Sequence, residues 1–425
     1  MSTMEALSQT ERLIERGVGP GGPTLEAHLR RNGGLPLPNL DGGRLLAEIE
    51  RAGLTGRGGA GFPTFKKLHL AQSGVRTTLV VNLMEGEPAS AKDRFLVTKS
   101  PHLVVDGAEI LASALGAKKI VICVPANSAA LPQLLVRVLA ERAAQRSPTT
   151  TIEVQRLSGR YVSGEESALV SSVAGHVGVP RFRLDKSVPL TIGRDTALVH
   201  NVETLANIAL IARYGADWFR SVGSPEAPGT RLITVSGSVE RPGVVEIATG
   251  TPISAILELA GPTSPIQAVL VGGYGGTWLP GQHAGVAFAP TELAAFGASM
   301  GVGVLVALGA GSCGIRETAR IASFMASESS GQCGPCLFGL PAIAEDLQAL
   351  ADAKVDRGIL DRLDHRLGIV DGRGACRHPD GVVRLVRSAL VVFATDIDSH
   401  VRGVACAGSA RTSVLMGRLS IADRR

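Results

Sequence analysis

Apolar positions along the first half of the chain alternate between helical and strand-like spacing. The amphipathic helical pattern GGRLLAEIERAG at 42–53 is followed by the apolar runs TTLVVN (77–82), KIVICV (119–124) and TTIEVQRL (150–157). Apolar runs of strand length that alternate with helical patterns predict an α/β layer with a largely parallel sheet. Residues 1–42 are polar and rich in glycine and proline, and we predict an arm that packs over this layer.

The pattern changes after VGSPEAPGT at 222–230, which has the composition of a linker. RLITVSGSVERPGVVEI (231–247) predicts two strands around a turn, PISAILELAG (252–261) predicts a helix, and QAVLVGG (267–273) predicts another strand. Two strands, a helix and further strands within about eighty residues indicate a small β-grasp-like domain.

The last part of the chain is mostly helical in pattern. Residues 294–315 form an uncharged run, but six glycines interrupt it and its centre, VGVLVAL, has only the length of a buried strand. Four helical patterns then follow one another: IRETARIASFMASE, LPAIAEDLQALAD, GILDRLDHRLG and VVRLVRSALVVFATDIDSHV. We therefore predict an α/β fold with three domains: an N-terminal arm and α/β domain at 1–225, a β-grasp domain at 226–312 and a helical domain at 313–425.

Composition narrows the class of protein. The 425 residues are 45% hydrophobic and 19% charged, as in a globular chain of two or three domains, and residues 1–22 lack the apolar core of a secretory signal. A net charge of +5 without a basic run, and with 4% aromatic residues, argues against nucleic-acid binding and fits an acidic protein partner. Six cysteines are too few for a disulfide scaffold and favour a cytoplasmic protein with a thiolate site.

The glycine-dense loop GLTGRGGAGFPTFKKL (53–68) is the first candidate for ligand binding. Its glycines satisfy G-x-G-x-x-G, but a helical pattern and not a strand precedes them, so a Rossmann dinucleotide site is rejected. Backbone N–H groups of such a loop, with Arg57 inside it and Lys66 and Lys67 after it, can still bind a phosphate. A mobile surface loop is the alternative, but the density of glycines followed by Phe62 favours a ligand cradle.

The stretch VVNLMEGEPASAKDR (80–94) leaves an apolar strand and turns at once through Asn82, Glu85 and Glu87. Open α/β sheets bind ligands at this position, where an amide can recognise a flavin and carboxylates can bind hydroxyl groups. A solvated loop with a structural asparagine is an equally good interpretation of this stretch alone.

In YVSGEESALVSSVAG (161–175), Ser163 and Glu166 form an S-x-x-E capping box before an apolar helix. Capping explains much of this motif but leaves Glu165 without a role. A carboxylate at a helix N-terminus can hydrogen-bond a nicotinamide or its ribose without a counterion, because the helix end carries partial positive charge.

The stretch ESSGQCGPC (328–336) has the form of a metal-cluster loop with one ligand changed. C-x-x-C-x-x-C on a loop kinked by glycine and proline, with a fourth cysteine from elsewhere, can surround an iron–sulfur cube. Cys333 and Cys336 fit this pattern and Cys376 lies forty residues further on, whereas Ser330 occupies the first position. The other three cysteines lie in apolar sequence and are predicted to belong to the core: Cys123, Cys313 and Cys406.

Together and in this order, these stretches resemble the NADH-binding FMN and iron–sulfur flavoprotein subunit of respiratory complex I and related NAD-linked diaphorase subunits. The resemblance runs from about Gly53 to Cys376. It implies an α/β domain that binds FMN in the glycine loop with NADH stacked over it, then a β-grasp domain, then a helical bundle with a 4Fe–4S cluster. The flavin of that family accepts a hydride and passes electrons singly to the cluster.

The resemblance also implies roles for individual residues, and the chemistry itself belongs to the cofactors, so no catalytic side chain is assigned. FMN is expected to contact Gly56, Arg57, Gly58, Gly59, Lys67, Asn82, Glu85, Gly164, Glu166, Asn201 and Thr204. NADH is expected to contact Phe62, Glu87, Glu165 and Arg183. The cluster is expected on Cys333, Cys336 and Cys376, with Ser330 at the fourth position.

Four departures from the family weaken parts of this expectation. NLMEGEP replaces the family's N-A-D-E-S-E-P and puts Met84 where a carboxylate is expected near the flavin, and His200 replaces an asparagine. RLDKSVP (183–189) replaces a Lys-Pro-Pro-Phe-Pro stretch that helps to hold NADH, so Arg183 stands in for the lysine and no aromatic residue follows. Ser330 excludes a cluster held by four thiolates and predicts a Ser-ligated 4Fe–4S centre, a 3Fe–4S centre or none, because iron in clusters prefers soft thiolate.

These observations lead to one main hypothesis and two alternatives. The main hypothesis is a cytoplasmic FMN-dependent oxidoreductase that passes electrons from NADH to a ferredoxin-like iron–sulfur partner, without nucleic-acid binding or direct membrane insertion. The first alternative is a relative that has lost NADH activity and relays electrons between a ferredoxin and another protein. The second is a noncatalytic β-grasp scaffold.

Overall fold

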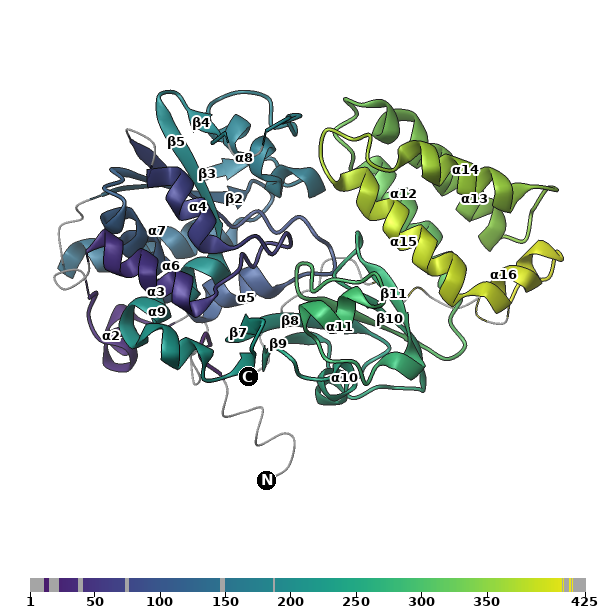
Figure 1. Cartoon of the computed structure of the whole chain (residues 1–425), viewed down its shortest axis with the longest axis horizontal. Helices are drawn as coiled ribbons and strands as arrows, with labels where there is room; N and C mark the ends of the chain where they lie inside the picture. The colour runs from purple at the N-terminus through teal and green to yellow at the C-terminus, as the bar shows by residue number, and fades with distance from the viewer. Residues whose placement is uncertain are drawn as a thin grey trace.

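The computed structural model describes residues 11–14, 23–36, 41–72, 76–145, 150–185, 188–406, 408, 413 and 415. In chain order these residues form a sheet covered by helices, a second sheet with short helices, and a bundle of helices. Figure 1 shows the first sheet and the helical bundle at opposite ends of the molecule, with the second sheet between and below them. The predicted fold class is therefore confirmed.

The first sheet has the strand order β3-β2-β1-β5-β4. Its strands are β1 (Thr77–Asn82), β2 (Lys119–Pro125), β3 (Thr151–Leu157), β4 (Thr191–Ile192) and β5 (Asp195–Asn201). All neighbours are parallel except β4 and β5. The three predicted strands are confirmed, whereas the sequence pattern did not predict β5, whose apolar run is short and flanked by polar residues. Because β2 and β5 lie on either side of β1, the strand order changes direction at the β1–β5 junction.

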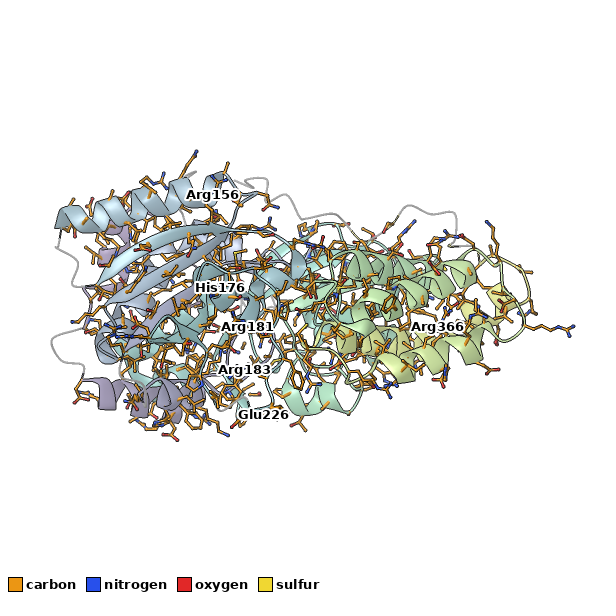
Figure 2. The ribbon with its side chains drawn as sticks, turned by 90° about the horizontal axis from the view of Figure 1, so that it is seen from above. Arg156, His176, Arg181, Arg183, Glu226 and Arg366 are labelled. Atoms are coloured by element: carbon orange, nitrogen blue, oxygen red, sulfur yellow. The ribbon has the colours of Figure 1, made fainter. Side chains whose placement is uncertain are left out.

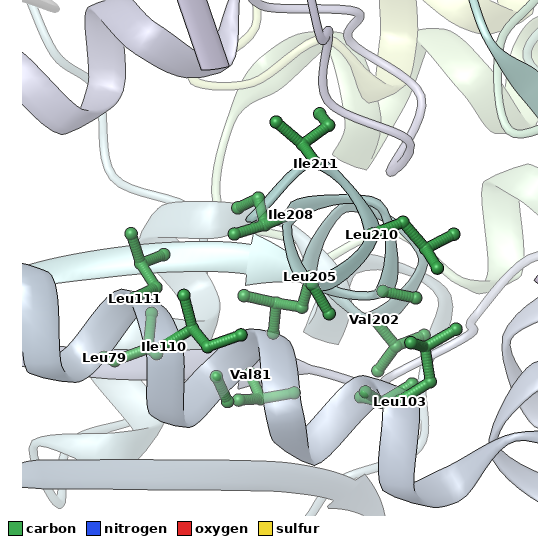
Figure 3. Close-up of a cluster of buried hydrophobic side chains, with 14 of the residues drawn as sticks. Leu79, Val81, Leu103, Ile110, Leu111, Val202, Leu205, Ile208, Leu210 and Ile211 are labelled. Carbon is green, nitrogen blue, oxygen red and sulfur yellow. The ribbon is translucent and has the colours of Figure 1, made fainter. Parts of the chain in front are cut away.

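Helices cover both faces of this sheet. They are α3 (Gly42–Ala52), α4 (Thr64–Gln72), α5 (Lys92–Lys99), α6 (Pro101–Ala114), α7 (Ala130–Gln145), α8 (Glu166–Val173) and α9 (Val202–Arg220). Leu79 and Val81 of β1 join a core with Ile110 of α6 and Leu205 of α9 (Figure 3). Between them, Val80 points to the other face and belongs to a smaller cluster with α8. Strand alternation thus buries both faces of the sheet.

The N-terminal arm packs on the α/β part and also reaches the second sheet. Helix α2 (Leu25–Asn32) lies against α6 and α7, and its buried His28 contacts Asp106 with 2.7 Å between Nε2 and Oδ2. The main-chain N–H of Leu13 donates to the carboxylate of Glu246 in the second sheet at 3.0 Å. The described residues of this arm, 11–14 and 23–36, thus contact both the α/β part and the second sheet, and its other residues lie outside the described part of the chain apart from 41 and 42.

The second sheet has the order β11-β10-β12-β8-β9. Its strands are β8 (Thr230–Gly237), β9 (Gly243–Ala248), β10 (Ile266–Val271), β11 (Thr277–Pro280) and β12 (Val304–Gly309). The first and last strands, β8 and β12, are parallel neighbours in the middle, with α10 (Ile253–Ala260) and α11 (Pro290–Ala294) in the connections. This is the predicted β-grasp arrangement, and the run VGVLVAL forms the buried strand β12, as expected.

The segment predicted to be a linker is packed instead. Residues 222–230 contain the two-stranded hairpin β6 (Gly223–Ser224) and β7 (Ala227–Pro228), and β7 is buried. A Cβ atom on Gly229 would lie 2.4 Å from the ring of Phe219 at the end of α9. The glycines and prolines of this segment therefore permit close packing between the two sheets and do not mark a flexible linker.

The chain ends in the helical bundle. Its helices are α12 (Gly314–Ser327), α13 (Leu340–Ala351), α14 (Ile359–Val370), α15 (His378–Val392) and α16 (Ala394–Val401). The last predicted helical pattern is broken in two at Phe393, which is 2% exposed and packs edge-on against Trp278 of β11. Among the helices that the structure describes, none is both long and apolar enough to cross a membrane.

Candidate functional site

The predicted flavin residues meet at the carboxyl ends of β1 and β5. Asn82 and Asn201 are the last residues of these strands and lie opposite one another in the sheet. The amide of Asn82 donates to the carbonyl of Gly164 at 2.9 Å, and a Cβ on Gly58 would lie 3.5 Å from Cβ of Asn201. Three motifs that are far apart in the sequence thus converge where the strand order changes direction, the usual ligand position in open α/β sheets.

The glycine loop has a defined conformation. The N–H of Gly56 donates to the carbonyl of Phe62 at 2.9 Å, which closes the loop. Gly59 and Gly61 have φ values of 112° and 61°, a region that only glycine adopts readily. Phe62 remains 42% exposed at the rim. The mobile-loop alternative is therefore disfavoured, and the segment retains the form of a cradle.

The side chain of Arg57 points away from this cradle. Its main-chain N–H donates to the hydroxyl of Thr204 at 2.9 Å, which ties the loop to α9. Its guanidinium is buried and faces the carbonyls of Pro228 and Thr230. Burial, together with the nearby charge of Arg231, lowers the pKa of Arg57 to about 10. Arg57 therefore joins the loop to the second sheet and does not present its charge to a phosphate in the cradle.

Lys67 is the cation that faces the ends of the strands. Its Nζ donates to Glu166 Oε1 at 2.7 Å and to the carbonyl of Val199 at 3.2 Å. Both side chains of the ion pair are partly exposed. Because the pair is partly exposed, Lys67 can exchange Glu166 for an anionic ligand without leaving a buried, unpaired charge behind.

Beside Lys67, His200 is a buried histidine whose Nε2 has no hydrogen-bond partner among the described residues. Burial, reinforced by the charge of Lys67, lowers the pKa of His200 to about 3. The side chain is therefore neutral near pH 7. An unpartnered buried nitrogen at the end of β5 is what a missing polar ligand would leave, because buried polar groups normally have partners.

Acid sensitivity provides a test of this placement. The unfolded chain protonates His200 near pH 6.5 and the folded chain only near pH 3, so folding stability should fall as the pH falls through this window. In the ligand-free protein, His200→Asn should remove this loss, amounting to about 2 kcal/mol between pH 7 and pH 5. Denaturant unfolding of both proteins across this range measures it, and His69→Asn, at an exposed histidine of α4, is the control. Parallel pH profiles for wild type and His200→Asn would contradict the placement.

Two predicted ligand carboxylates act as helix caps. Glu85 accepts hydrogen bonds from the main-chain N–H groups of Asp93 and Arg94 and from the Arg94 guanidinium, all at the start of α5. Glu165 is the N-cap of α8 and accepts from the N–H groups of Ser167 and Ala168. The predicted capping box that starts at Ser163 is wrong, because α8 begins two residues later than that box requires. The side chain of Glu85 is buried and uses both of its oxygens in this way, whereas Glu165 is partly exposed and caps the helix through Oε2 alone.

Glu87 lies where the first and second sheets meet. Its Oε2 accepts from the hydroxyl of Tyr161 at 3.2 Å and from the N–H of Tyr274 at 2.9 Å. Burial raises the pKa of Glu87 to about 7. The neighbouring Met84 is 2% exposed and packs with apolar residues such as Leu169, so it supplies no polar contact in place of the expected carboxylate.

A buried charge cluster below Asn201 was not predicted. Lys92 is 1% exposed and contacts Asp93 at 2.6 Å and Glu203 at 2.9 Å. Asp93 Oδ2 accepts from the amide of Asn201 at 2.7 Å. The partners come from α5 and α9, and only Glu203, a charged residue in the mostly apolar stretch of α9, could have indicated the cluster. It holds the Asn201 amide in one orientation.

The loop expected near the nicotinamide is largely exposed. Arg183 donates to the carbonyl of Val188 across the loop, and residues 186–187 lie outside the described part. Figure 2 labels Arg183, Arg181 and His176 along the boundary between the α/β part and the rest of the molecule. The sequence prediction that no aromatic residue follows Arg183 stands for this loop, although the exposed Phe182 precedes it.

The predicted cluster cysteines come together beside the α/β part. Burial, together with the neighbouring sulfur atoms of Cys333 and Cys376, raises the pKa of Cys336 to about 12. Cys376 is also within electrostatic reach of Glu165. The amide of Gln332 in the same loop donates to the carbonyl of Pro180 at 2.5 Å. Cys333 and Cys336 of this loop thus lie near Cys376 of a later segment, and Gln332 joins the loop to the α/β part, with Ser330 partly exposed at the start of the loop.

Aromatic rings connect Glu87 with this loop. The ring of Tyr161, whose hydroxyl contacts Glu87, has its centroid 5.4 Å from that of His378 and 6.1 Å from that of Phe324. The N–H of His378 donates to the sulfur of Cys376. Sequence analysis did not single out these residues, because the rings come from three separate segments.

A glycine cradle at the switch point of a parallel sheet, a β-grasp part and a loop of clustered thiols define the class of flavin- and iron–sulfur-binding electron-transfer proteins. Residues 49–210 match the Nuo51 FMN-binding domain, residues 232–264 the SLBB domain, and residues 316–400 the NADH-ubiquinone oxidoreductase-F iron–sulfur binding region. The chain belongs to the family of the NADH-quinone oxidoreductase F subunits.

Relatives and solved structures support this assignment. The chain is 30% identical over 376 residues to the NADH-quinone oxidoreductase F protein of Streptomyces coelicolor, covering 85% of this chain and 84% of the relative. It is 28% identical over 373 residues to the NADH-quinone oxidoreductase F 2 protein of Rhizobium meliloti, covering 84% and 89%. The fold is similar to a chain of an NAD+-reducing [NiFe]-hydrogenase. The air-oxidized structure gives a TM-score of 0.80 at 30% identity over 94% of this chain and 67% of that one. The H2-reduced structure gives 0.77 at 31% identity over 85% of this chain, and this chain spans 62% of that hydrogenase chain.

Proposed function

We propose that this chain is an FMN-dependent electron-transfer subunit of the NADH dehydrogenase type, which passes electrons from NADH through FMN to an iron–sulfur partner. The convergence of the glycine loop, Asn82 and Asn201 at the β1–β5 junction, beside a loop of three thiols, carries this proposal. A noncatalytic scaffold has no use for this combination of sites.

The residues at the junction fit FMN. Four of the six residues from Gly56 to Gly61 are glycines and the side chain of Arg57 points away, which leaves room for a phosphate, and Lys67 supplies a partly exposed positive charge. The orphaned Nε2 of His200 and the amide of Asn82 supply polar contacts for a ring system. FMN, when bound, supplies the step between two-electron and one-electron transfer, and these residues bind and orient it.

The proposed nicotinamide contacts are fewer. Phe62 at the rim can stack on a ring, and Glu87 lies buried at the junction of the sheets. Arg183 offers a positive charge on an exposed loop. Since Glu165 uses Oε2 to cap α8, the proposed NADH site relies mainly on Phe62, Glu87 and Arg183, with Oε1 of Glu165 as a further acceptor.

The three thiols fit an iron–sulfur centre with three cysteine ligands, namely a 3Fe–4S cluster or a 4Fe–4S cluster with Ser330 as the fourth ligand. Such a centre transfers single electrons. The rings of Tyr161, His378 and Phe324 lie between Glu87 and the cluster loop. The proposed partner is a ferredoxin-like protein, and a thiolate centre of this kind favours the reducing cytoplasm.

The division into domains at 1–225, 226–312 and 313–425 also stays a proposal. The first sheet ends at Asn201, the second spans Thr230 to Gly309, and the first helix of the bundle starts at Gly314. These limits agree with the proposed boundaries to within the connecting segments.

Flavin and NADH titrations test the proposal. The chain should bind FMN with quenching of flavin fluorescence, and Lys67→Met should weaken binding by about tenfold to a hundredfold, the value of a charge-assisted hydrogen bond. Lys66→Met, at the exposed neighbour, is the matched control. Anaerobic NADH should then bleach the flavin band. If FMN binds but only a reduced ferredoxin bleaches it, the relay alternative, which the burial of Met84 favours, replaces the main proposal.

A further inference from the structure

Cys313 is the N-cap of α12, at the end of this helix that is opposite the cluster loop, and it meets His400 of α16 and Cys406 there. Figure 1 shows α12 and α16 in the bundle. Among the described residues, they form the group of three His, Cys, Asp or Glu side chains whose ligand atoms all lie within 4.8 Å of one another. Sequence analysis predicted that Cys313 and Cys406 belong to the core. Both do pack there, but that prediction missed the histidine between them.

The histidine is oriented as metal ligands are. Its Nδ1 lies 2.9 Å from the carbonyl of Leu350 at the end of α13, so Nδ1 carries the proton and donates it. The lone pair of Nε2 then faces Cys313, with 3.6 Å between Nε2 and Sγ. A metal-bound histidine almost always donates its second ring N–H to such an acceptor, which fixes the ring and its tautomer.

The two cysteines are also held in place. Cys313 is the N-cap of α12 and its sulfur accepts from the N–H of Arg316 at 3.4 Å. Burial raises the pKa of Cys313 to about 11, and the Arg316 N–H offsets only part of this, so the thiol is protonated until a metal ion displaces its proton. The main-chain N–H of Cys406 donates to Nε2 of His400 at 3.3 Å, so a metal ion on Nε2 would replace this hydrogen bond. A Cβ on Gly408 would lie 2.4 Å from the carbonyl carbon of Ser312, so the segment after α16 lies directly on the turn before Cys313.

A carboxylate lies near this group, although its oxygens are not within 4.8 Å of all three ligand atoms. Asp396 lines the same hollow of about 400 Å³ as Cys406, and its charge acts on both Cys313 and His400. One of its oxygens, Oδ2, is buried without a hydrogen-bond partner among the described residues. Two cysteines, one histidine and an oxygen donor form the tetrahedral set that zinc prefers. The cluster thiols are spaced too widely for a single zinc ion, because the sulfur atoms of Cys333, Cys336 and Cys376 do not all lie within 4.8 Å of one another.

We propose that Cys313, His400 and Cys406 bind a zinc ion, with Asp396 as the fourth ligand directly or through a water molecule. The ion joins the start of α12, the end of α16 and the segment after it, where α13 also ends. It stabilises the bundle that carries the cluster loop and takes no part in electron transfer, because zinc has no redox chemistry.

Metal analysis of the full chain tests the proposal. Protein produced with zinc in the medium should contain one zinc ion per chain by mass spectrometry of the elements. Cys406→Ser should lower zinc affinity by at least about tenfold and leave iron unchanged, and Asp396→Asn should weaken zinc binding by about tenfold. The Cys376→Ser protein should show the reverse pattern, with iron lost and zinc retained. This pair separates a failure of the zinc site from a failure of the cluster.

A cobalt titration keeps the test independent of the folding of Cys406→Ser. Cobalt added to the reduced Cys376→Ser chain, in which the cluster loop lacks its third thiol, should give thiolate charge-transfer bands and the visible bands of tetrahedral cobalt. Zinc should displace it and raise the thermal midpoint of unfolding. The proposal would be overturned by any of three results. These are the absence of the cobalt bands, an equal zinc content in wild type and Cys406→Ser, and a Cys313–Cys406 disulfide that persists under reducing conditions without metal uptake.

Discussion

Replacing Ser330 by cysteine should change the iron content of this protein from about three to about four atoms per chain, because it completes the set of four thiolates that a 4Fe–4S cluster requires. Serine is the poorer ligand, since its alkoxide is hard and far from deprotonated at neutral pH. In the structure Ser330 begins the loop that carries Cys333 and Cys336, so the new thiol needs no rearrangement of the fold.

The measurement is iron and sulfide analysis with EPR on anaerobically purified protein. Wild type should show a signal of an oxidised three-iron centre, and Ser330→Cys a signal that appears only on reduction. Ser329→Cys adds a thiol one residue away and is the matched control, which should leave the iron content at the wild-type value. If both proteins contain about four iron atoms per chain, the wild type holds the Ser-ligated 4Fe–4S centre instead, and if neither exceeds about three, the loop does not use its first position as a ligand.

Replacing Gly107 by alanine should destabilise the α/β part more than any other change proposed for it. A Cβ at this position of α6 would lie 1.9 Å from the carbonyl oxygen of Leu205 in α9. The added methyl group would clash with the backbone of Leu205, which cannot move aside as a side chain can. The two helices must therefore separate, at a cost of about 3 kcal/mol or more. Because α9 carries Asn201 and Thr204, FMN affinity should fall in parallel.

Thermal unfolding and FMN titration check this expectation. The midpoint for the α/β part should fall by about 10 °C. Gly368→Ala is the control, since Gly368 also lies within a helix, α14, but has no atom within 4 Å of the added Cβ. Alanine there should be neutral or stabilise by up to about 1 kcal/mol, because glycine is the poorer helix former. Equal midpoints for the two variants would mean that α6 and α9 do not cross as closely as in this structure.

The strands and helices that the sequence predicted best are those with a strong local pattern. TTLVVN and KIVICV are buried on both faces and therefore carry uninterrupted apolar runs. The strand β5 was not predicted because its apolar run is short and ends in the polar residues His200 and Asn201, which belong to the candidate site. The long helical pattern at 382–401 was not divided, because the break at Phe393 depends on its contact with Trp278 in another part of the chain.

The candidate site was predictable where a residue type is required by the backbone or by metal chemistry. The glycine loop needs φ values that other residues avoid, and the cluster loop needs thiols at fixed spacing. The sequence did not predict in the same way whether a carboxylate binds a ligand or caps a helix. Glu85 and Glu165 look like ligands in sequence, yet the nearest unsatisfied N–H groups belong to the helices that follow them, and the carboxylates cap those helices.

By itself, the sequence determined the order of the three parts, the cradle, and the serine in place of a cluster cysteine, because these follow from local periodicity and residue type. Only the tertiary structure decided which charged side chains remain available to a ligand. It turned Arg57 toward the second sheet and left Lys67 at the strand ends. It also brought His400 to Cys313 and Cys406. A side chain pairs with whatever lies near it in space, and the sequence does not show which residues far apart in the chain become neighbours.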